Sequence, residues 1–117
     1  MTAKVSIQEP LMHYQWGNGC DGWNFVSEQT LSVKQERMPA GTSEALHYHR
    51  LAQQFFFIIK GEALFEIDGH QVVVKEQEGI HIKPGQQHRI INQSGSSIEF
   101  ILSSQPSIEG DRINIGL

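Results

Sequence analysis

Apolar and polar residues alternate along much of this 117-residue chain, and a period of two is typical of half-buried β-strands. The runs 31–34 and 63–67 show the alternation clearly. Turn-forming residues recur between such runs, and Asp68-Gly69, between 63–67 and 71–75, predicts a tight hairpin. No long segment keeps the helical period of about 3.6 residues. The pattern predicts an all-β fold, either a sandwich or a small barrel.

The composition is that of an ordinary folded domain, with 38% hydrophobic and 19% charged residues. The net charge is −4 and no cluster of Lys or Arg is present, so we expect no nucleic-acid partner. We also expect no membrane span, because the longest apolar run, Phe55–Ile59, is far too short. The chain is expected to be one domain overall. Residues 1–30 would supply N-terminal strands and a Gly/Trp loop that packs on the barrel or on a partner, and residues 31–117 would form the barrel.

Two features bear on the cellular location. The first residues, Met1–Ser6, lack the apolar core of a signal peptide. Cys20 is the only cysteine, so the chain has no internal disulfide, which is common for proteins in a reducing compartment. These features predict a cytoplasmic protein.

Three histidines stand out by their spacing. His47 and His49 lie at the head of a strand-like run, and residues two apart on a strand face the same side. His88 follows after a turn-rich stretch, and an adjacent strand of a barrel would bring it to the same point. Three neutral imidazoles suit a divalent transition metal. We expect one such ion per chain, either Fe, Mn, Ni or Zn.

A sequence motif surrounds the first two histidines. It consists of a glycine, a His-x-His pair, a polar residue and a second glycine, at positions Gly41, His47, His49, Gln54 and Gly61. This motif resembles the first signature of the cupin superfamily. We expect Gly41 to occupy a turn that passes close to other backbone.

A second motif follows a hairpin and contains Pro84, Gly85, His88 and Asn92. It resembles the second cupin signature, and the order and separation of the two motifs also match. The resemblance implies a double-stranded β-helix, or jelly-roll, barrel. It also implies that His47, His49 and His88 are metal ligands.

Gln54 departs from the cupin motif, which has a glutamate at this position. A glutamine side chain offers at most a neutral carbonyl oxygen, so a bound divalent ion would keep its full +2 charge. This favours ligands that bind as anions, such as a carboxylate or an enolate. Two roles for Gln54 stay open, namely direct ligation of the metal and a hydrogen bond that orients a histidine.

Strand alternation also predicts the walls of a ligand cavity. If Gln54 faces inward, so do the apolar residues two and four positions later. By the same argument His88 shares its face with the residues two and four positions after it. We expect a metal at one end of an apolar tube that binds a small ligand and is lined by Phe56, Ile58, Phe65, Ile90 and Asn92.

Three functions are compatible with this site. The first is a mononuclear metal dioxygenase that acts on a small chelating anion, because cupins with three histidines and no acid include dioxygenases of gentisate and β-diketone type. The second is a non-catalytic metal or small-molecule binding module, such as a sensor. A sugar-phosphate isomerase is a weaker third, since few basic residues are placed to bind a phosphate.

The opposite face of the same strand carries Phe55, Phe57 and Ile59, which are too apolar to face solvent. Either the N-terminal strands or a second subunit must cover them, and we predict a homodimer. The segment 16–23 contains two tryptophans and three glycines. It would form either a mobile lid or a loop whose tryptophans pack on the barrel wall.

Overall fold

The computed structural model describes residues 4–108 and 110–115. Within these ranges the chain forms β-strands joined by turns and loops, without a helix. The strands are β1 (Met12–Trp16), β2 (Cys20–Ser27), β3 (Ser32–Met38), β4 (His47–His49), β5 (Gln53–Lys60), β6 (Ala63–Ile67), β7 (His70–Val74), β8 (Gly79–Ile82), β9 (His88–Ile91), β10 (Ile98–Gln105) and β11 (Arg112–Asn114).

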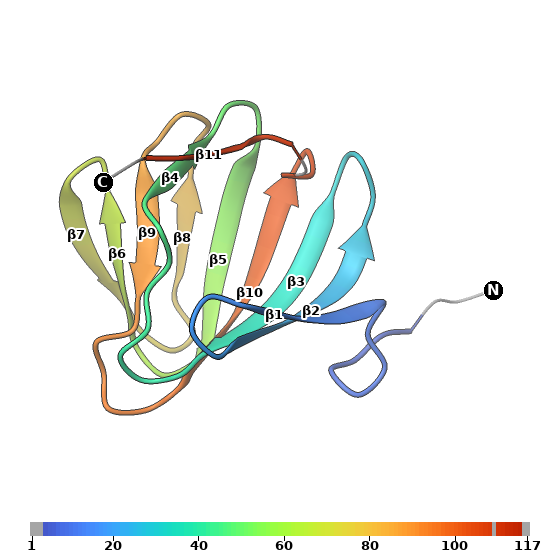
Figure 1. The fold of residues 1–117 in the computed structure, drawn as a ribbon, viewed down its shortest axis with the longest axis horizontal. Coiled ribbons are helices and arrows are strands. Elements are labelled where there is room, and N and C mark those ends of the chain that lie inside the picture. Colours follow the sequence, from blue (N-terminus) through green and yellow to red (C-terminus); the bar gives the residue numbers. More distant parts are fainter. Residues whose placement is uncertain (1–3, 109, 116–117) are drawn as a thin grey trace.

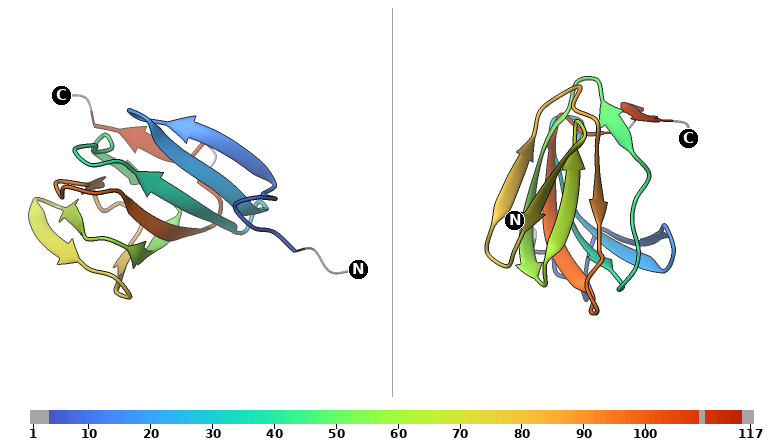
Figure 2. Two further views of the ribbon diagram at one scale, coloured as in Figure 1. Left: turned by 90° about the horizontal axis from the view of Figure 1, so that it is seen from below. Right: turned by 90° about the vertical axis from the view of Figure 1, so that its left-hand side faces the viewer.

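The strands form two antiparallel sheets that face each other (Figures 1 and 2). One sheet has the order β1-β2-β3-β10-β5-β8 and the other has the order β11-β4-β9-β6-β7. Chain neighbours such as β3 and β4 lie in different sheets, so the chain crosses repeatedly from one layer to the other. This is a jelly-roll β-barrel, and the predicted all-β fold is confirmed.

The hydrophobic core fills the space between the sheets. On β5, Gln54, Phe56 and Ile58 are buried, whereas the alternate positions are more exposed. The rings of Phe56 and Phe65 meet edge to face with centroids 5.0 Å apart, across the two sheets. The inward face predicted for β5 is therefore confirmed.

Two turn predictions are confirmed. Asp68 and Gly69 form the turn between β6 and β7 and both have positive φ, 50° and 83°, as a tight hairpin turn requires. The expectation that Gly41 lies close to other backbone is confirmed, because its backbone nitrogen donates to the carbonyl oxygen of Asn92 at 2.9 Å, although a Cβ at Gly41 would meet no atom within 4 Å. Gly41 also has a φ of +79°, a left-handed conformation that favours glycine.

The N-terminal strands β1 and β2 extend the larger sheet beyond β3, and they do not cover the outer face of β5. Phe55 on that face is 44% exposed. Of the two expected covers, the N-terminal strands are therefore excluded, and a second subunit stays a prediction.

Of the two expectations for the segment 16–23, the structure agrees with packed tryptophans, although the segment is a short hairpin and not a long loop. It forms the tight turn and flanking positions of the β1–β2 hairpin, with Trp16 paired to Cys20. Trp16 packs against the hydrophobic core and Trp23 is buried. Among the residues that the structure describes, no helix could span a lipid bilayer.

Candidate metal centre

The three predicted histidines meet at one point inside the barrel. Strands β4 and β9 are antiparallel neighbours, and His47 pairs directly with His88. His49 lies two residues beyond His47 on the same face, so all three rings point inward. Each of the three side chains has a ring nitrogen within 4.8 Å of those of the other two, and all three residues are at most 2% exposed. The convergence expected from the sequence is confirmed.

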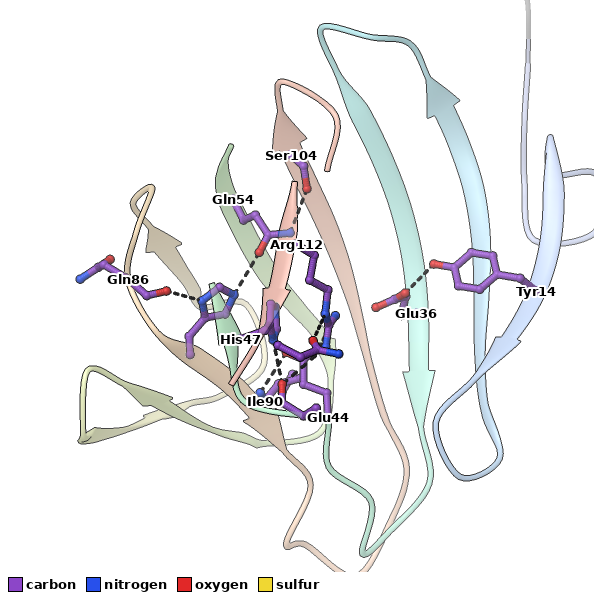
Figure 3. A network of polar contacts seen from close by, with 12 residues as sticks. Tyr14, Glu36, Glu44, His47, Gln54, Gln86, Ile90, Ser104 and Arg112 are labelled. Atoms are coloured by element: carbon purple, nitrogen blue, oxygen red, sulfur yellow. Dashed lines mark hydrogen bonds and ion pairs between the residues drawn. The ribbon is translucent and has the colours of Figure 1, made fainter. Parts of the chain in front are cut away.

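Backbone carbonyls fix the protonation of two of these rings. Nδ1 of His47 lies 2.8 Å from the carbonyl oxygen of Ala45, and Nδ1 of His88 lies 2.9 Å from that of Gln86 (Figure 3). A carbonyl only accepts hydrogen bonds, so Nδ1 carries the proton in both rings. Each Nε2 therefore keeps a lone pair, which is the arrangement of histidine ligands in metal sites.

Gln54 connects this cluster to the larger sheet. Its amide nitrogen donates to Oγ of Ser104 at 3.0 Å, and its Oε1 lies 3.1 Å from Nε2 of His88. Because that Nε2 is unprotonated, two acceptors face each other. A cation beside both atoms would remove the repulsion, and so would an amide turned around to donate to His88. Both roles predicted for Gln54 remain compatible with its position.

His49 is the clearest sign of a missing partner. Both of its ring nitrogens are buried, and neither has a hydrogen-bond partner among the described residues. A buried polar group without a partner costs about 1–3 kcal/mol. A metal ion bound by one nitrogen of His49 together with His47 and His88 would offset part of this cost. Three imidazoles and an amide oxygen fit a divalent transition metal.

The electrostatics keep the rings neutral, as metal ligands must be. Burial lowers the pKa of His47 to about 3, although its hydrogen bond to Ala45 opposes the shift. Burial and the neighbouring His88 lower the pKa of His49 to about 4. Burial also lowers the pKa of His88. All three rings therefore carry a lone pair at neutral pH.

A cavity of about 180 Å³ opens beside the cluster, and its wall differs from the predicted one. Phe56 lines it as expected, but Ile58, Phe65, Ile90 and Asn92 do not. These four residues are buried in the core, because the aromatic rings fill the barrel below the histidines. Asn92 instead fastens a loop, since its Nδ2 donates to the carbonyl oxygens of Met38 and Ser96. The cavity is lined by Tyr14, Trp16, Lys34, Glu36, Glu44, His47, His49, Gln54, Phe56, Leu102, Ile108 and Arg112.

Charged and phenolic side chains make the cavity more polar than the predicted apolar tube. The hydroxyl of Tyr14 donates to Glu36, and Nη1 of Arg112 lies 3.6 Å from Glu44. Burial raises the pKa of Glu36, against the effect of its hydrogen bond with Tyr14. Burial also raises the pKa of Glu44 to about 8, although Arg112 opposes it.

Sequence reasoning missed these residues because they come from strands far apart in the chain. Tyr14 is on β1, Glu36 on β3 and Arg112 on β11. One signal was present, since β3 places polar residues, Lys34 and Glu36, at alternate positions between buried Ser32 and Met38. That pattern indicates a strand with polar side chains facing the interior.

Comparison with known proteins identifies the family of this chain. Residues 34–104 match the family model of the cupin domain, Cupin_2. The oxalate-binding protein of Thermotoga maritima is 29% identical over 65 residues, which are 56% of this chain and 54% of that protein. The matched part of this chain spans between 44% and 60% of the curated relatives.

Solved structures share the whole fold. A predicted oxalate decarboxylase of Thermotoga maritima superposes with a TM-score of 0.78 at 21% identity, covering 90% of this chain and 100% of that one. The nucleoside dehydratase Pac13 of Streptomyces superposes with a TM-score of 0.81 at 14% identity, covering 98% and 92%. The family model covers more than half of the sequence and the jelly-roll fold agrees with it, so this chain belongs to the cupin family.

Proposed function

We propose that this cupin binds one divalent transition metal through His47, His49 and His88, and that the metal holds a small chelating anion in the adjacent cavity. The observation that carries the proposal is the buried His49 ring, whose two nitrogens have no partner within the described structure. Three imidazoles within reach of one ion, all neutral at pH 7, supply the donors.

The charge of the site determines the kind of ligand. Three neutral histidines and the neutral Gln54 leave the +2 charge of a bound ion uncompensated. An anion with two oxygen donors, such as a dicarboxylate or the enolate of a β-diketone, would balance it. The cavity of about 180 Å³ is small, so the ligand has few non-hydrogen atoms.

A dioxygenase-type reaction is the proposed chemistry. A redox-active metal, when bound, would supply electrons and act as a Lewis acid toward the chelated anion. The chain's own part is to orient and to exclude water. Phe56 and Leu102 line the cavity from the larger sheet, while the carbonyls of Ala45 and Gln86 hold His47 and His88 in the ligating tautomer.

Metal content tests the first half of this proposal. Protein purified without added metal, or incubated with Fe(II), Mn(II), Ni(II) or Zn(II), is expected to hold close to one ion per chain by elemental analysis. His49→Ala removes one of three strong ligands and should weaken binding at least tenfold. The exposed His81 provides the matched control, and His81→Ala should bind like the wild type. No uptake of any of these ions would refute the site.

Oxygen consumption tests the second half. Iron-loaded protein is expected to consume oxygen with at least one compound in a panel of β-diketones, gentisate-like acids and catechols. A protein that binds a compound of the panel tightly without consuming oxygen would contradict the dioxygenase proposal.

That outcome would favour a second candidate, non-catalytic binding of a small carboxylate. The similarity to the oxalate-binding protein of Thermotoga maritima supports this candidate. Oxalate should then bind the metal-loaded protein in calorimetry and be recovered unchanged after prolonged incubation.

A further inference from the structure

A tyrosine and a glutamate form a hydrogen-bonded pair on the cavity wall, away from the histidines (Figure 3). Tyr14 on β1 pairs in register with Gly22 on β2, and Gly22 pairs with Glu36 on β3. The three residues therefore form one row across three neighbouring strands. The phenol of Tyr14 crosses the middle strand to reach the carboxylate of Glu36.

Gly22 makes this crossing possible. A Cβ atom at Gly22 would overlap the ring and the hydroxyl of Tyr14. Any other residue at this position would push the phenol away from Glu36. The pair thus depends on the absence of a side chain at the residue between its members.

We infer that the Tyr14–Glu36 pair is a specificity site for a hydroxyl group at the far end of the ligand whose other end is chelated at the histidines. This inference rests on the proposed function and names the ligand class more closely. The ligand is a small acid that chelates the metal at one end and carries an uncharged hydroxyl at the other. Both members of the pair line the same cavity as His47 and His49. A ligand that extends from the histidine cluster along the cavity would therefore meet the pair.

The surrounding charges favour a hydroxyl over a charged group. A carboxylate would be repelled by Glu36 in its ionised form. The guanidinium of Arg112, which could attract a carboxylate, is already held by Glu44, by the carbonyl of Ala45 and by the side chain of Asn114.

An ammonium group is disfavoured for the opposite reason, because Lys34 also lines the cavity, with its Nζ 5.5 Å from the centre of the Tyr14 ring. A hydroxyl both donates and accepts, so it matches the carboxyl of Glu36 in either protonation state. Burial raises the pKa of Glu36, which favours its protonated form more than water does.

A matched series of four-carbon 2-hydroxy acids tests the inference by calorimetry on nickel-loaded protein. The three probes share the chelating end and differ at the other, which is a methyl in 2-hydroxybutyrate, a hydroxyl in 2,4-dihydroxybutyrate and a carboxylate in malate. We expect 2,4-dihydroxybutyrate to bind about tenfold more tightly than either of the other two. Malate as the tightest ligand would overturn the inference, since the cations would then select the ligand.

Variants locate the effect. Tyr14→Phe keeps the ring but loses the hydroxyl, and Gly22→Ala displaces the ring. Both should reduce the preference for 2,4-dihydroxybutyrate to less than threefold, while the affinity for 2-hydroxybutyrate stays within twofold of the wild type. Tyr48→Phe is the matched control, because Tyr48 alternates with His47 and His49 on β4 and faces the other way. An unchanged preference in Tyr14→Phe would overturn the inference.

A readout without metal keeps the test independent of nickel loading. In metal-free protein with ¹³C-labelled tyrosine, the Cζ resonance of Tyr14, assigned from Tyr14→Phe, should shift in Gly22→Ala and in Glu36→Gln. An unshifted resonance in both variants would show that the pair does not exist in solution and would overturn the inference.

The outcomes separate the two proposals. Failure to bind any of Fe(II), Mn(II), Ni(II) and Zn(II) overturns the proposed function, and the inference falls with it. Nickel-loaded protein that binds no 2-hydroxy acid overturns the inference alone, because a dicarboxylate or an enolate could still be the chelated anion. Equal binding of 2-hydroxybutyrate and 2,4-dihydroxybutyrate overturns the inference alone.

Discussion

The amide oxygen of Gln54 lies 3.1 Å from Nε2 of His88. The other contacts of the two side chains make both of these atoms hydrogen-bond acceptors. The carbonyl of Gln86 takes the only proton of the neutral His88 ring, and Ser104 accepts from the other end of the amide. Two lone pairs that face each other inside a protein need a positive charge or a turned amide. This relationship makes Gln54 the most informative position to change.

Gln54→Glu should strengthen metal binding at least tenfold, because the new carboxylate adds a negative charge beside the ion. The same change should destabilise the metal-free protein by about 2 kcal/mol, since a carboxyl group would be buried among the histidines. Nickel titration and urea unfolding measure the two effects. Gln53→Glu is the control on the exposed neighbour. Nickel affinity within twofold of the wild type would show that Gln54 orients His88 and does not bind the metal.

Stability of the metal-free protein should fall at acidic pH because of the buried histidines. The pKa values of His47, about 3, and His49, about 4, lie below the ordinary 6.5, so the unfolded chain takes up protons that the folded one does not. Their stabilising effect is complete above pH 6.5 and is lost as the pH falls toward 4. Between pH 6.5 and the pKa of the folded state, each ring that stays neutral lowers the free energy of unfolding by about 1.4 kcal/mol for every unit by which the pH falls. Urea unfolding between pH 7 and pH 4 tests this.

Glu44 has the opposite effect. Its pKa is raised from 4.5 to about 8, so its stabilising effect is complete below pH 4.5 and is lost as the pH rises to about 8. Burial raises the pKa of Glu36 as well, in the same sense. Glu44→Gln should therefore flatten the loss of stability between pH 6.5 and 8. The double variant Glu36→Gln/Glu44→Gln lacks both opposing carboxyl groups, and a stability of this variant that does not change from pH 7 down to pH 4 would contradict the neutral histidines.

Asp111 ties the C-terminal strand to the loop that follows His49. Its carboxylate accepts hydrogen bonds from the backbone nitrogens of Arg50, Leu51 and Ala52, at distances between 2.9 and 3.2 Å. Burial opposes the charge of Asp111, but these donors outweigh it and lower its pKa. Asp111→Ala should cost about 1–2 kcal/mol of stability and weaken nickel binding severalfold, because His49 lies next to the loop. Asp111→Asn keeps one acceptor and should show a smaller loss in thermal unfolding. Equal stability of all three proteins would contradict this role.

The outer face of β5 predicts a homodimer. Phe55 is 44% exposed, and Phe57 and Ile59 on the same face are only partly buried. A second copy of the chain would remove this apolar surface from water. Sedimentation velocity should show a dimer that Phe55→Lys converts to a monomer. Val73→Lys, on the exposed part of β7, is the control and should stay dimeric. A monomeric wild type at micromolar concentration would refute the prediction.

The alternation of residues along single strands determined which side chains of this protein face inward. Alternation on β5 correctly placed Gln54 and Phe56 inside, because each strand sends successive side chains to opposite faces whatever its neighbours are. The paired histidines of β4 followed from the same rule, and their spacing relative to His88 identified the cupin motifs.

Only the tertiary structure decided what fills the barrel and what lines the cavity. Phe65 and Ile90 face inward as predicted, yet they are packed into the core, because available space depends on the rings that meet from both sheets. Tyr14 and Arg112 reach the cavity from opposite ends of the chain, since β1 extends one sheet and β11 extends the other. Side-chain parity is a property of one strand, and it follows from sequence alone. Which strands become neighbours depends on long-range pairing, and this pairing set the chemistry of the cavity wall.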